Sequence, residues 1–242
     1  MIPPDLTAKY GLSPDETALA IEDAITATLS AAFATEVHVR LGEQVEISAL
    51  RSAPDTDFYA IDPAALSGHL RRQVRLRIEH ELEKRQTLRD WERLRCLRGA
   101  LVRGEPGKRL PTGDLPVTLQ IEDHYRGLIL TGLCPCRYLP VQERGPLATG
   151  TLKTFLVTSV LPVWERRRAK VLIRLSRTSP ALPEILLRQL SGADGLRCRR
   201  RIAGAFSEIE TPRPLPRAAI LAVGRELGER IIVRVLVPQE TR

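Results

Sequence analysis

Three arginines alternate along one predicted strand, at a spacing that suits contacts with phosphate. The segment Leu196–Ile202 has the sequence LRCRRRI. Because side chains alternate between the two faces of a strand, Arg197, Arg199 and Arg201 are expected on the same face. A guanidinium group binds phosphate through a planar fork of N–H donors, so such a row could neutralise a nucleic-acid backbone. The alternative is a solvated strand face whose charges protect a sheet edge.

A second group of arginines, Arg166, Arg167 and Arg168, lies in a charged turn between two alternating apolar segments, Phe155–Leu161 and Lys170–Leu175. The two apolar segments read as the arms of a β-hairpin. Both groups of arginines are therefore our hypothesis for contacts with a nucleic-acid backbone.

Four aromatic residues, Tyr125, Tyr138, Phe155 and Trp164, lie in the part of the chain that is rich in predicted strands. Aromatic rings of this kind can stack on unpaired bases. Aromatic residues make up only 4% of the chain, so some of the four must fill the core. We take Tyr125 and Tyr138 as the candidates for base contact.

No arrangement of residues points to catalysis. We find no paired carboxylates, no Ser/His/Asp set and no glycine-rich phosphate loop at a useful spacing. Gly104 and Gly107 lie in predicted turns, and His124 beside Asp123 is better explained as a turn residue than as a base. We therefore predict that the protein is not an enzyme and uses no cofactor or small-molecule substrate.

The four cysteines also give a weak case for a metal. Only Cys134 and Cys136 form a close pair, while Cys96 and Cys198 stand alone. Zinc sites bring most ligands in pairs two to four residues apart, and the histidines do not complete such a set. We predict reduced structural thiols and no metal site.

Composition and charge limit the class of partner. The net charge is +8 and the sequence pI is about 9.8, which favours a polyanionic partner. Arginine-rich coding in a GC-rich genome is the alternative explanation. No apolar run approaches the roughly 20 residues that span a bilayer, and the first residues, MIPPDLTAKY, lack the apolar core of a signal peptide. We expect a cytoplasmic protein without a membrane partner.

The elements that must position these residues begin with a helix. Ser13-Pro14-Asp15-Glu16 combines an N-cap, a proline at the first helical position and a glutamate three residues after the cap, which predicts a helix over 14–33. Three short strands are expected at 36–41, 44–49 and 58–61, followed by a long helix from Asp62-Pro63 to about 95.

After Cys96 the hydrophobic period changes from helical to two, which predicts strands. Strands are expected at 97–103, 117–122, 128–131, 155–161 and 170–175, with a short piece at 137–139. Short strands at this density suit an OB-type barrel, a fold that commonly binds single-stranded nucleic acid. The remaining residues predict a helix after Pro180, a strand at 196–202, a helix at 218–227 and a strand at 230–237. The segment 203–217 is left open.

The fold class is therefore α+β and multidomain. The predicted modules are an α/β head with a long helix (residues 1–95), an OB-type barrel (96–177) and an αβ tail (178–242).

With this module order, the chain resembles the bacterial transcription elongation, termination and antitermination factor NusA over most of its length. The most specific similarity is IRLSRTSPALPEILLRQ (173–189), which resembles the exit from the barrel of that family into its first KH domain. The segment 72–102 looks like the long helix that runs into the first barrel strand. Leu139-Pro140, Gly150 and SVLP (159–162) fall where the ribosomal S-one-type barrel has its Leu-Pro, linker glycine and penultimate strand, and 224–237 resembles the end of the KH domain.

The resemblance implies a polymerase-binding head, an S-one-type OB barrel and a KH-like tail. It also implies a non-catalytic transcription factor that binds core RNA polymerase near the RNA exit and contacts nascent RNA, so that pausing, termination or antitermination is modulated. The chain departs from the family in two ways: no G-x-x-G loop lies between Ile202 and Arg230, and there is no room for a second KH domain. We therefore expect a shortened paralogue with a degenerate KH-like tail.

The candidate RNA-binding residues are Arg166, Arg167, Arg168, Arg197, Arg199, Arg201, Tyr125 and Tyr138. Two other interpretations stay open: a stand-alone binder of single-stranded RNA or DNA that uses the barrel and the basic tail, and a structural subunit of a larger particle.

Overall fold

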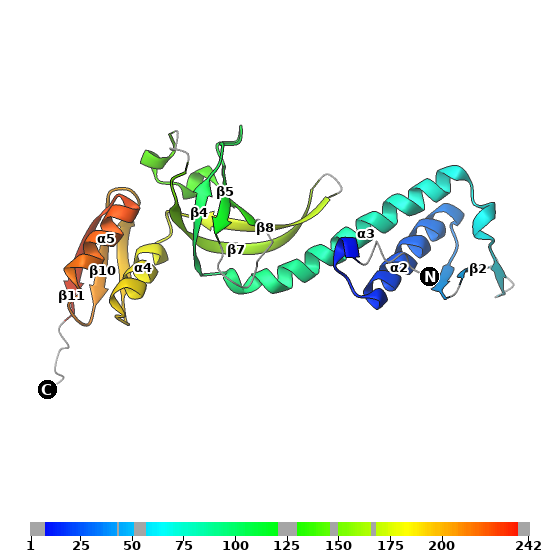
Figure 1. The fold of residues 1–242 in the computed structure, drawn as a ribbon, viewed down its shortest axis with the longest axis horizontal. Helices are drawn as coiled ribbons and strands as arrows, with labels where there is room; N and C mark the ends of the chain where they lie inside the picture. Colours follow the sequence, from blue (N-terminus) through cyan, green and yellow to red (C-terminus); the bar gives the residue numbers. More distant parts are fainter. Residues whose placement is uncertain are drawn as a thin grey trace. The chain divides into compact units, whose positions relative to one another are not determined.

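The computed structural model describes residues 8–42, 44–50, 57–120, 130–145, 150–165 and 168–236. The chain has an α+β fold with several sheets (Figure 1). It divides into two compact units, residues 1–93 with 162–171, and residues 94–161 with 172–242. Among the described residues, every helix is too short or too polar to cross a membrane.

The first long helix, α2 (Pro14–Phe33), begins where the sequence predicts it. Its N-terminus is closed by a capping box: the Glu16 N–H donates to Ser13 Oγ over 3.2 Å, and the Ser13 N–H donates to Glu16 Oε2 over 2.8 Å. Such a reciprocal pair satisfies two of the N–H groups that a helix leaves unpaired at its start. The predicted boundary is confirmed.

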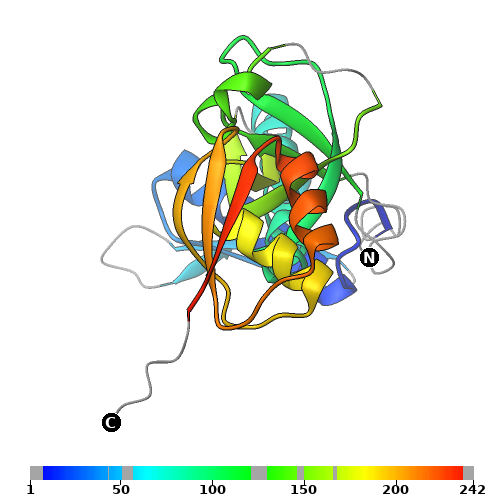
Figure 2. The ribbon, with the colours of Figure 1, turned by 90° about the vertical axis from the view of Figure 1, so that its left-hand side faces the viewer.

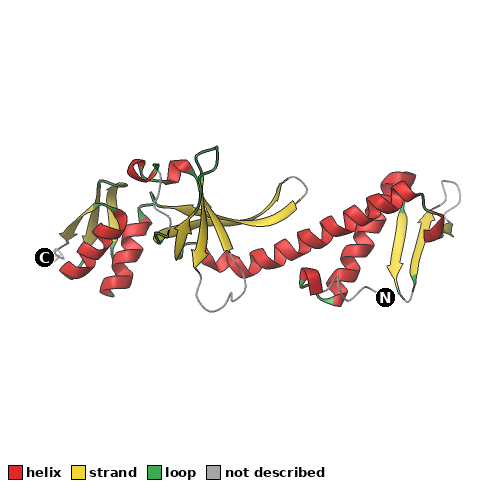
Figure 3. Cartoon of the chain, turned by 45° about the horizontal axis from the view of Figure 1, so that its top comes forward, coloured by secondary structure: helices red, strands yellow, loops and turns green. Residues whose placement is uncertain are grey.

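The head sheet contains β1 (Val37–Leu41), β2 (Val45–Leu50) and β3 (Phe58–Ala60), paired antiparallel in chain order. A 3-10 turn, η1 (Pro63–Ala65), leads to the long helix α3 (Gly68–Leu94). The core of the head joins apolar residues of α2, β1 and β2 to a stripe on α3. Figure 3 shows α2 lying alongside α3.

The second unit opens with a closed five-stranded barrel in the order β4-β5-β6-β8-β7. Its β6 and β8 are parallel, whereas β4 pairs antiparallel with both β5 and β7. Gly132 on β6 makes room for the Leu175 side chain, since a Cβ there would lie 2.6 Å from Leu175 Cδ1. The chain enters the barrel through η2 (Arg95–Leu97), and the strands are β4 (Leu101–Pro106), β5 (Leu115–Gln120), β6 (Leu130–Cys134), β7 (Lys153–Glu165) and β8 (Arg168–Ser176).

The short strand predicted at 137–139 is wrong. This part of the chain forms two 3-10 turns, η3 (Cys136–Tyr138) and η4 (Val141–Glu143). Each turn follows a proline, Pro135 or Pro140, which has no N–H for a strand ladder and a fixed φ near −65°. The Tyr138 N–H instead donates to the Pro135 carbonyl at 2.8 Å.

The tail has the element order αββαβ and a sheet in the order β11-β10-β9. The middle strand, β10, fills the segment that the sequence left open; it pairs antiparallel with β9 and parallel with β11. Both helices lie on the same face of this sheet (Figure 2), and their core also takes in Leu156 of the barrel. The elements are α4 (Ala181–Ser191), β9 (Arg197–Ile202), β10 (Phe206–Thr211), α5 (Arg217–Leu227) and β11 (Arg230–Val235).

Candidate nucleic-acid interface

A β-bulge in β9 changes which arginines share a face. In the register against β10, Arg200 stands opposite Glu208, and the next residue of β10, Ile209, stands opposite Cys198. Arg199 therefore has no partner in the register and is the extra residue of the bulge. A bulge of this kind shifts the alternation of side chains by one position. The expected common face of Arg197, Arg199 and Arg201 is therefore wrong for Arg201, which points to the helix side.

Arg201 is held inside the tail by a buried carboxylate. Its side chain is 3% exposed and that of Glu229 is fully buried, and Arg201 Nη2 donates to Glu229 Oε1 over 2.7 Å. Ser207 Oγ and the Gly204 N–H donate to the same carboxylate. Burial alone would raise the pKa of Glu229, but these hydrogen bonds outweigh it and hold the pKa below its usual range. Arg201 is thus a structural residue, and its buried guanidinium group is not available for the predicted contact with RNA.

The opposite face of the same sheet carries exposed arginines. Arg199 Nε lies 3.2 Å from Glu210 Oε1, and Arg197 stands opposite Glu210 in the strand register. The Arg200 guanidinium lies over the Phe206 ring, 5.5 Å from its centroid. Bulging at Arg199 therefore lets two consecutive arginines, Arg199 and Arg200, reach the face that the helices leave open.

The other edge strand, β11, adds two more arginines to this face. Arg234 Nη2 lies 3.5 Å from Glu208 Oε2, and Arg230 stands opposite Phe206 in the register. The central strand supplies the two carboxylates, Glu208 and Glu210. We call this surface the arginine face, and its residues are Arg197, Arg199, Arg200, Ile202, Phe206, Glu208, Glu210, Arg230, Ile232 and Arg234.

The remaining predicted contact residues do not gather on this face. Arg166, Arg167 and Tyr125 lie outside the described residues. Arg168 is exposed at the start of β8. Tyr138 is half-buried, with the Arg137 guanidinium 4.9 Å from its ring centroid, and its carbonyl accepts a hydrogen bond from the Arg177 N–H.

The two other aromatic residues considered for stacking have opposite environments. Phe155 is fully buried in the barrel, and the Arg177 guanidinium lies 5.8 Å from its ring centroid. Trp164, near the end of β7, is 46% exposed. Phe155 is therefore a core residue. This agrees with the expectation that some of the four aromatic residues fill the core.

A second buried arginine, which the sequence pattern does not single out, joins the barrel to the tail. Arg177 follows β8 directly, and its side chain is 1% exposed. Its Nε and Nη2 donate to Glu143 Oε2 and Oε1 over 2.7 and 2.8 Å, a bidentate pair. Its Nη1 donates to the Thr154 carbonyl and its Nη2 to the Glu226 carbonyl of α5. One side chain therefore ties η4, β7 and α5 together.

Neighbouring contacts complete this joint. Lys153 Nζ donates to Glu143 Oε1 over 2.6 Å, and the Thr154 N–H donates to Glu226 Oε1 over 2.8 Å. Burial alone would raise the pKa of Glu143, but the charges and hydrogen bonds of Arg177 and Lys153 outweigh it and lower the pKa. The carboxylate is therefore held in its charged form.

The turn between β9 and β10 also contacts the barrel. Gly204 has φ near +80°, and Gln142 Nε2 donates to its carbonyl over 3.1 Å. A Cβ at this position would lie 2.1 Å from Gln142 Oε1. The left-handed conformation and the close approach both favour glycine here.

In the described parts of the chain, no three histidine, cysteine or acidic side chains come together as a metal site. Cys134 is buried, and burial raises the pKa of its thiol to about 12. Burial likewise raises the pKa of Cys198. Both thiols are therefore held protonated at neutral pH, a state that reacts slowly and binds metal poorly.

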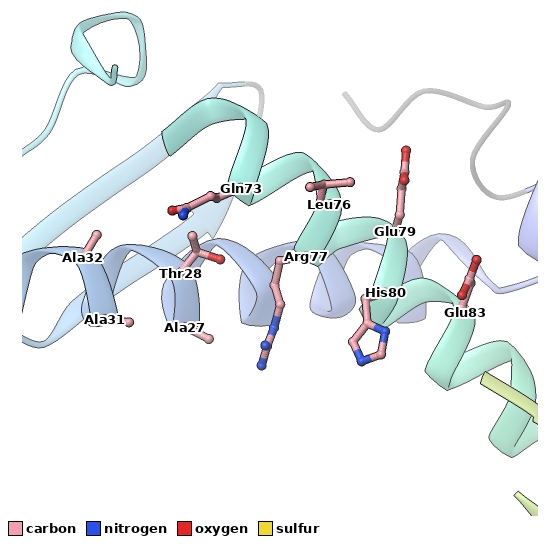
Figure 4. A pocket seen from close by; sticks show the side chains of 10 residues that line it. All are labelled: Ala27, Thr28, Ala31, Ala32, Gln73, Leu76, Arg77, Glu79, His80 and Glu83. Carbon is pink, nitrogen blue, oxygen red and sulfur yellow. The ribbon is translucent and has the colours of Figure 1, made fainter. Parts of the chain in front are cut away.

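The head carries a groove of about 960 Å³ between its two long helices (Figure 4). Alanines of α2 form one wall, and polar side chains of α3 form the other. His80 Nδ1 is buried there and has no hydrogen-bond partner among the described residues. The lining residues are Ala27, Thr28, Ala31, Ala32, Gln73, Leu76, Arg77, Glu79, His80 and Glu83.

Comparison of the sequence with protein-family models and with curated proteins finds no match to either.

Proposed function

We propose that this chain is a non-catalytic, NusA-like transcription factor of the cytoplasm. Its head binds core RNA polymerase near the RNA exit, and its barrel and tail contact nascent RNA, so that pausing, termination or antitermination changes. The observation that carries the proposal is the second compact unit, in which a closed barrel is joined through the buried Arg177 to an αββαβ tail with an exposed arginine face.

The strand order of the barrel supports an OB-type assignment. When the five strands are numbered in chain order, the closed order β4-β5-β6-β8-β7 becomes one, two, three, five, four, with the third and fifth strands parallel. An OB fold is a five-stranded Greek-key barrel that commonly takes oligonucleotides. This order therefore favours a nucleic-acid ligand for the second unit.

The tail supports the proposed degenerate KH-like domain through its element order. Two helices cover one face of a three-stranded sheet, and β10 and β11 are parallel on either side of the α5 crossover. KH domains clamp the nucleotide backbone with a G-x-x-G loop, and the sequence has no such loop between Ile202 and Arg230. RNA contacts of the tail must then come from other residues.

The head favours a protein partner over RNA. Basic side chains of α3 form ion pairs along the helix: Arg77 and Lys84 each lie 3.6 Å from Glu81. These basic groups therefore already have an acidic neighbour. Arg85 similarly pairs with Asp23 of α2. A simple RNA binder has no evident use for a module of this kind.

The test is co-purification of the full-length protein with core RNA polymerase from its own cell. We expect association in pull-downs, and we expect its loss when residues 1–95 are deleted. Circular dichroism of the truncated protein provides the control for folding. A folded truncation that still associates with polymerase would contradict the assignment of the head.

The alternative function is a stand-alone single-stranded RNA or DNA binder, which the net charge of +8 and the barrel favour. It predicts strongly salt-dependent oligonucleotide binding with no polymerase in the pull-down. A pull-down that identifies protein and RNA partners together separates the two functions. The same experiment would reveal a larger particle in which the chain is a structural subunit.

A further inference from the structure

We infer that the arginine face of the tail sheet binds the phosphate backbone of a single-stranded nucleic acid. The inference deepens the proposed function and rests on its RNA-binding part. It moves the contact from the helix side of the tail, where a G-x-x-G loop would act, to the sheet face that α4 and α5 leave open (Figure 2).

The first support is the charge balance of the face. Five arginines share it with two carboxylates, so its formal charge is positive. The carboxylates are less exposed than the arginines that they pair with. The side chain of Glu208 is 22% exposed and that of its partner Arg234 is 64% exposed. The side chain of Glu210 is 20% exposed and that of its partner Arg199 is 57% exposed. The carboxylates therefore orient the guanidinium groups from below and leave outer N–H donors facing solvent.

The second support is the bulge at Arg199. In a regular strand without a bulge, successive side chains point to opposite faces, so one of any two neighbouring arginines of β9 would point toward the helices. With the bulge, Arg199 and Arg200 both reach the open face while Arg201 enters the core. Bulges interrupt the hydrogen-bond ladder and are frequent where a side chain must be re-aimed for a functional contact.

The third support is the contact between Arg200 and Phe206. The guanidinium group of Arg200, on the edge strand β9, lies over the ring of Phe206, on the central strand β10. Arginine planes and aromatic rings are the groups on which unpaired bases stack. This pair can therefore add a sequence-tolerant base contact to the phosphate contacts around it.

The composition of the face favours nucleic acid over an acidic protein. The middle of a protein–protein interface is depleted of charged residues and carries apolar anchors. Here Glu208 and Glu210 occupy the middle of the central strand, the apolar pair Phe206 and Ile202 lies at one end of the face, and the positive charge is spread over both edge strands. Such a surface suits a ligand whose charge is repeated along its length.

The test compares two full-length variants that each remove three positive charges. R197Q/R199Q/R200Q changes the arginine face, and R188Q/R217Q/R225Q changes exposed arginines of α4 and α5. Binding is measured by fluorescence anisotropy with labelled uridine and thymidine oligonucleotides longer than the roughly 4–16 nucleotides that one OB fold covers. A salt series gives the slope of log K against log [salt], and thermal unfolding confirms that both variants fold.

We expect the sheet variant to bind at least about tenfold more weakly at low salt, with a slope reduced by about 0.7 for each phosphate that the variant no longer neutralises. The helix variant should keep the wild-type slope and affinity. The conservative variant R197K/R199K/R200K should keep the slope, because its charge is retained. A ribose-independent backbone contact predicts similar losses of affinity with both oligonucleotides, and a loss confined to one of them would contradict it.

Three other outcomes would overturn the inference. If both glutamine variants bind like wild type, RNA binding stands and the arginine face is a solvated surface. If only the helix variant weakens binding, the ligand lies on α4 and α5. If the sheet variant loses polymerase in the pull-down yet keeps the oligonucleotide, the face docks a protein. A wild-type protein that binds polymerase but no oligonucleotide would remove the RNA part of the proposed function itself.

Discussion

The barrel–tail joint and the arginine face use the same amino acid for opposite purposes. In and beside the joint, Arg177 and Arg201 are 1% and 3% exposed, and their carboxylate partners, Glu143 and Glu229, are 13% and 0% exposed. On the face, Arg199 and Arg234 are mostly exposed, and their carboxylate partners occupy only one side of each guanidinium. Arginine content by itself therefore says little about nucleic-acid binding, because burial decides which guanidinium groups are available.

The physical reason is the desolvation of charge. A buried guanidinium loses its hydration and depends on its partner, so removing that partner leaves an uncompensated charge at a cost of several kcal/mol. An exposed guanidinium keeps its water, and its ion pair contributes between about 0.2 and 1 kcal/mol. We therefore expect substitutions in the joint to change stability, and substitutions on the face to change binding.

The largest effect is expected for Arg177→Met. The substitution leaves the largely buried Glu143 carboxylate with only Lys153 as a charged partner, so the free energy of unfolding should fall by up to about 3–5 kcal/mol. Urea denaturation followed by circular dichroism measures this change. Adding Glu143→Gln to Arg177→Met should recover part of the stability, because it removes the stranded charge. If wild type and Arg177→Met were equally stable, the buried arginine of the joint would contribute no more to stability than the exposed arginines of the face.

An intermediate effect is expected from pH. The folded pKa values of Glu143 and Glu229 lie below the usual range, so their contribution to stability is fully present above the unfolded-state pKa of about 4.3 and is lost as pH falls through the folded pKa. The urea midpoint should therefore drop between about pH 5 and pH 3. The variant E143Q/E229Q should be less stable at neutral pH, and its midpoint should change less across the same range. An unchanged pH profile in this variant would assign the acid sensitivity to other groups.

The smallest effect is expected for Arg199→Ala. Its ion pair with Glu210 is exposed, so the free energy of unfolding should change by no more than about 1 kcal/mol. The thermal midpoint of Arg199→Ala, set beside that of Arg177→Met, measures the difference between exposed and buried arginines directly. A destabilisation as large as that of the buried arginine would mean that Arg199 has a structural role.

Local signals allowed much of the secondary structure to be predicted. The capping box at Ser13 and Glu16 placed the start of α2 correctly. The alternation of RIIVRV predicted β11, which ends at Val235 in the structure. β10 stayed open in the sequence because two of its three inward-facing residues, Ser207 and Thr211, are polar, so Ile209 is the only aliphatic residue that marks the inner face.

The candidate site could be predicted only in part, because its decisive features depend on pairing between distant segments. The bulge at Arg199 exists only against β10, so the alternation of β9 alone placed Arg201 on the wrong face. Arg177 meets Glu143 and Glu226 across 34 and 49 residues of chain. One clue was present in the sequence: a single arginine in the joint, between an apolar strand and an apolar helix, is a candidate for a buried ion pair.

The closure of the barrel has a consequence for the order in which the protein folds during synthesis. β4 needs β7 as a partner, and Leu101 pairs with Leu156. At roughly 5–20 residues per second, the ribosome makes the roughly 50 intervening residues in about 3–10 s. The head pairs neighbouring strands and can fold before then, whereas β4 must wait with the backbone N–H and C=O groups of one edge unpaired. During this interval the unpaired edge of β4 is open to pairing with another chain, which favours aggregation.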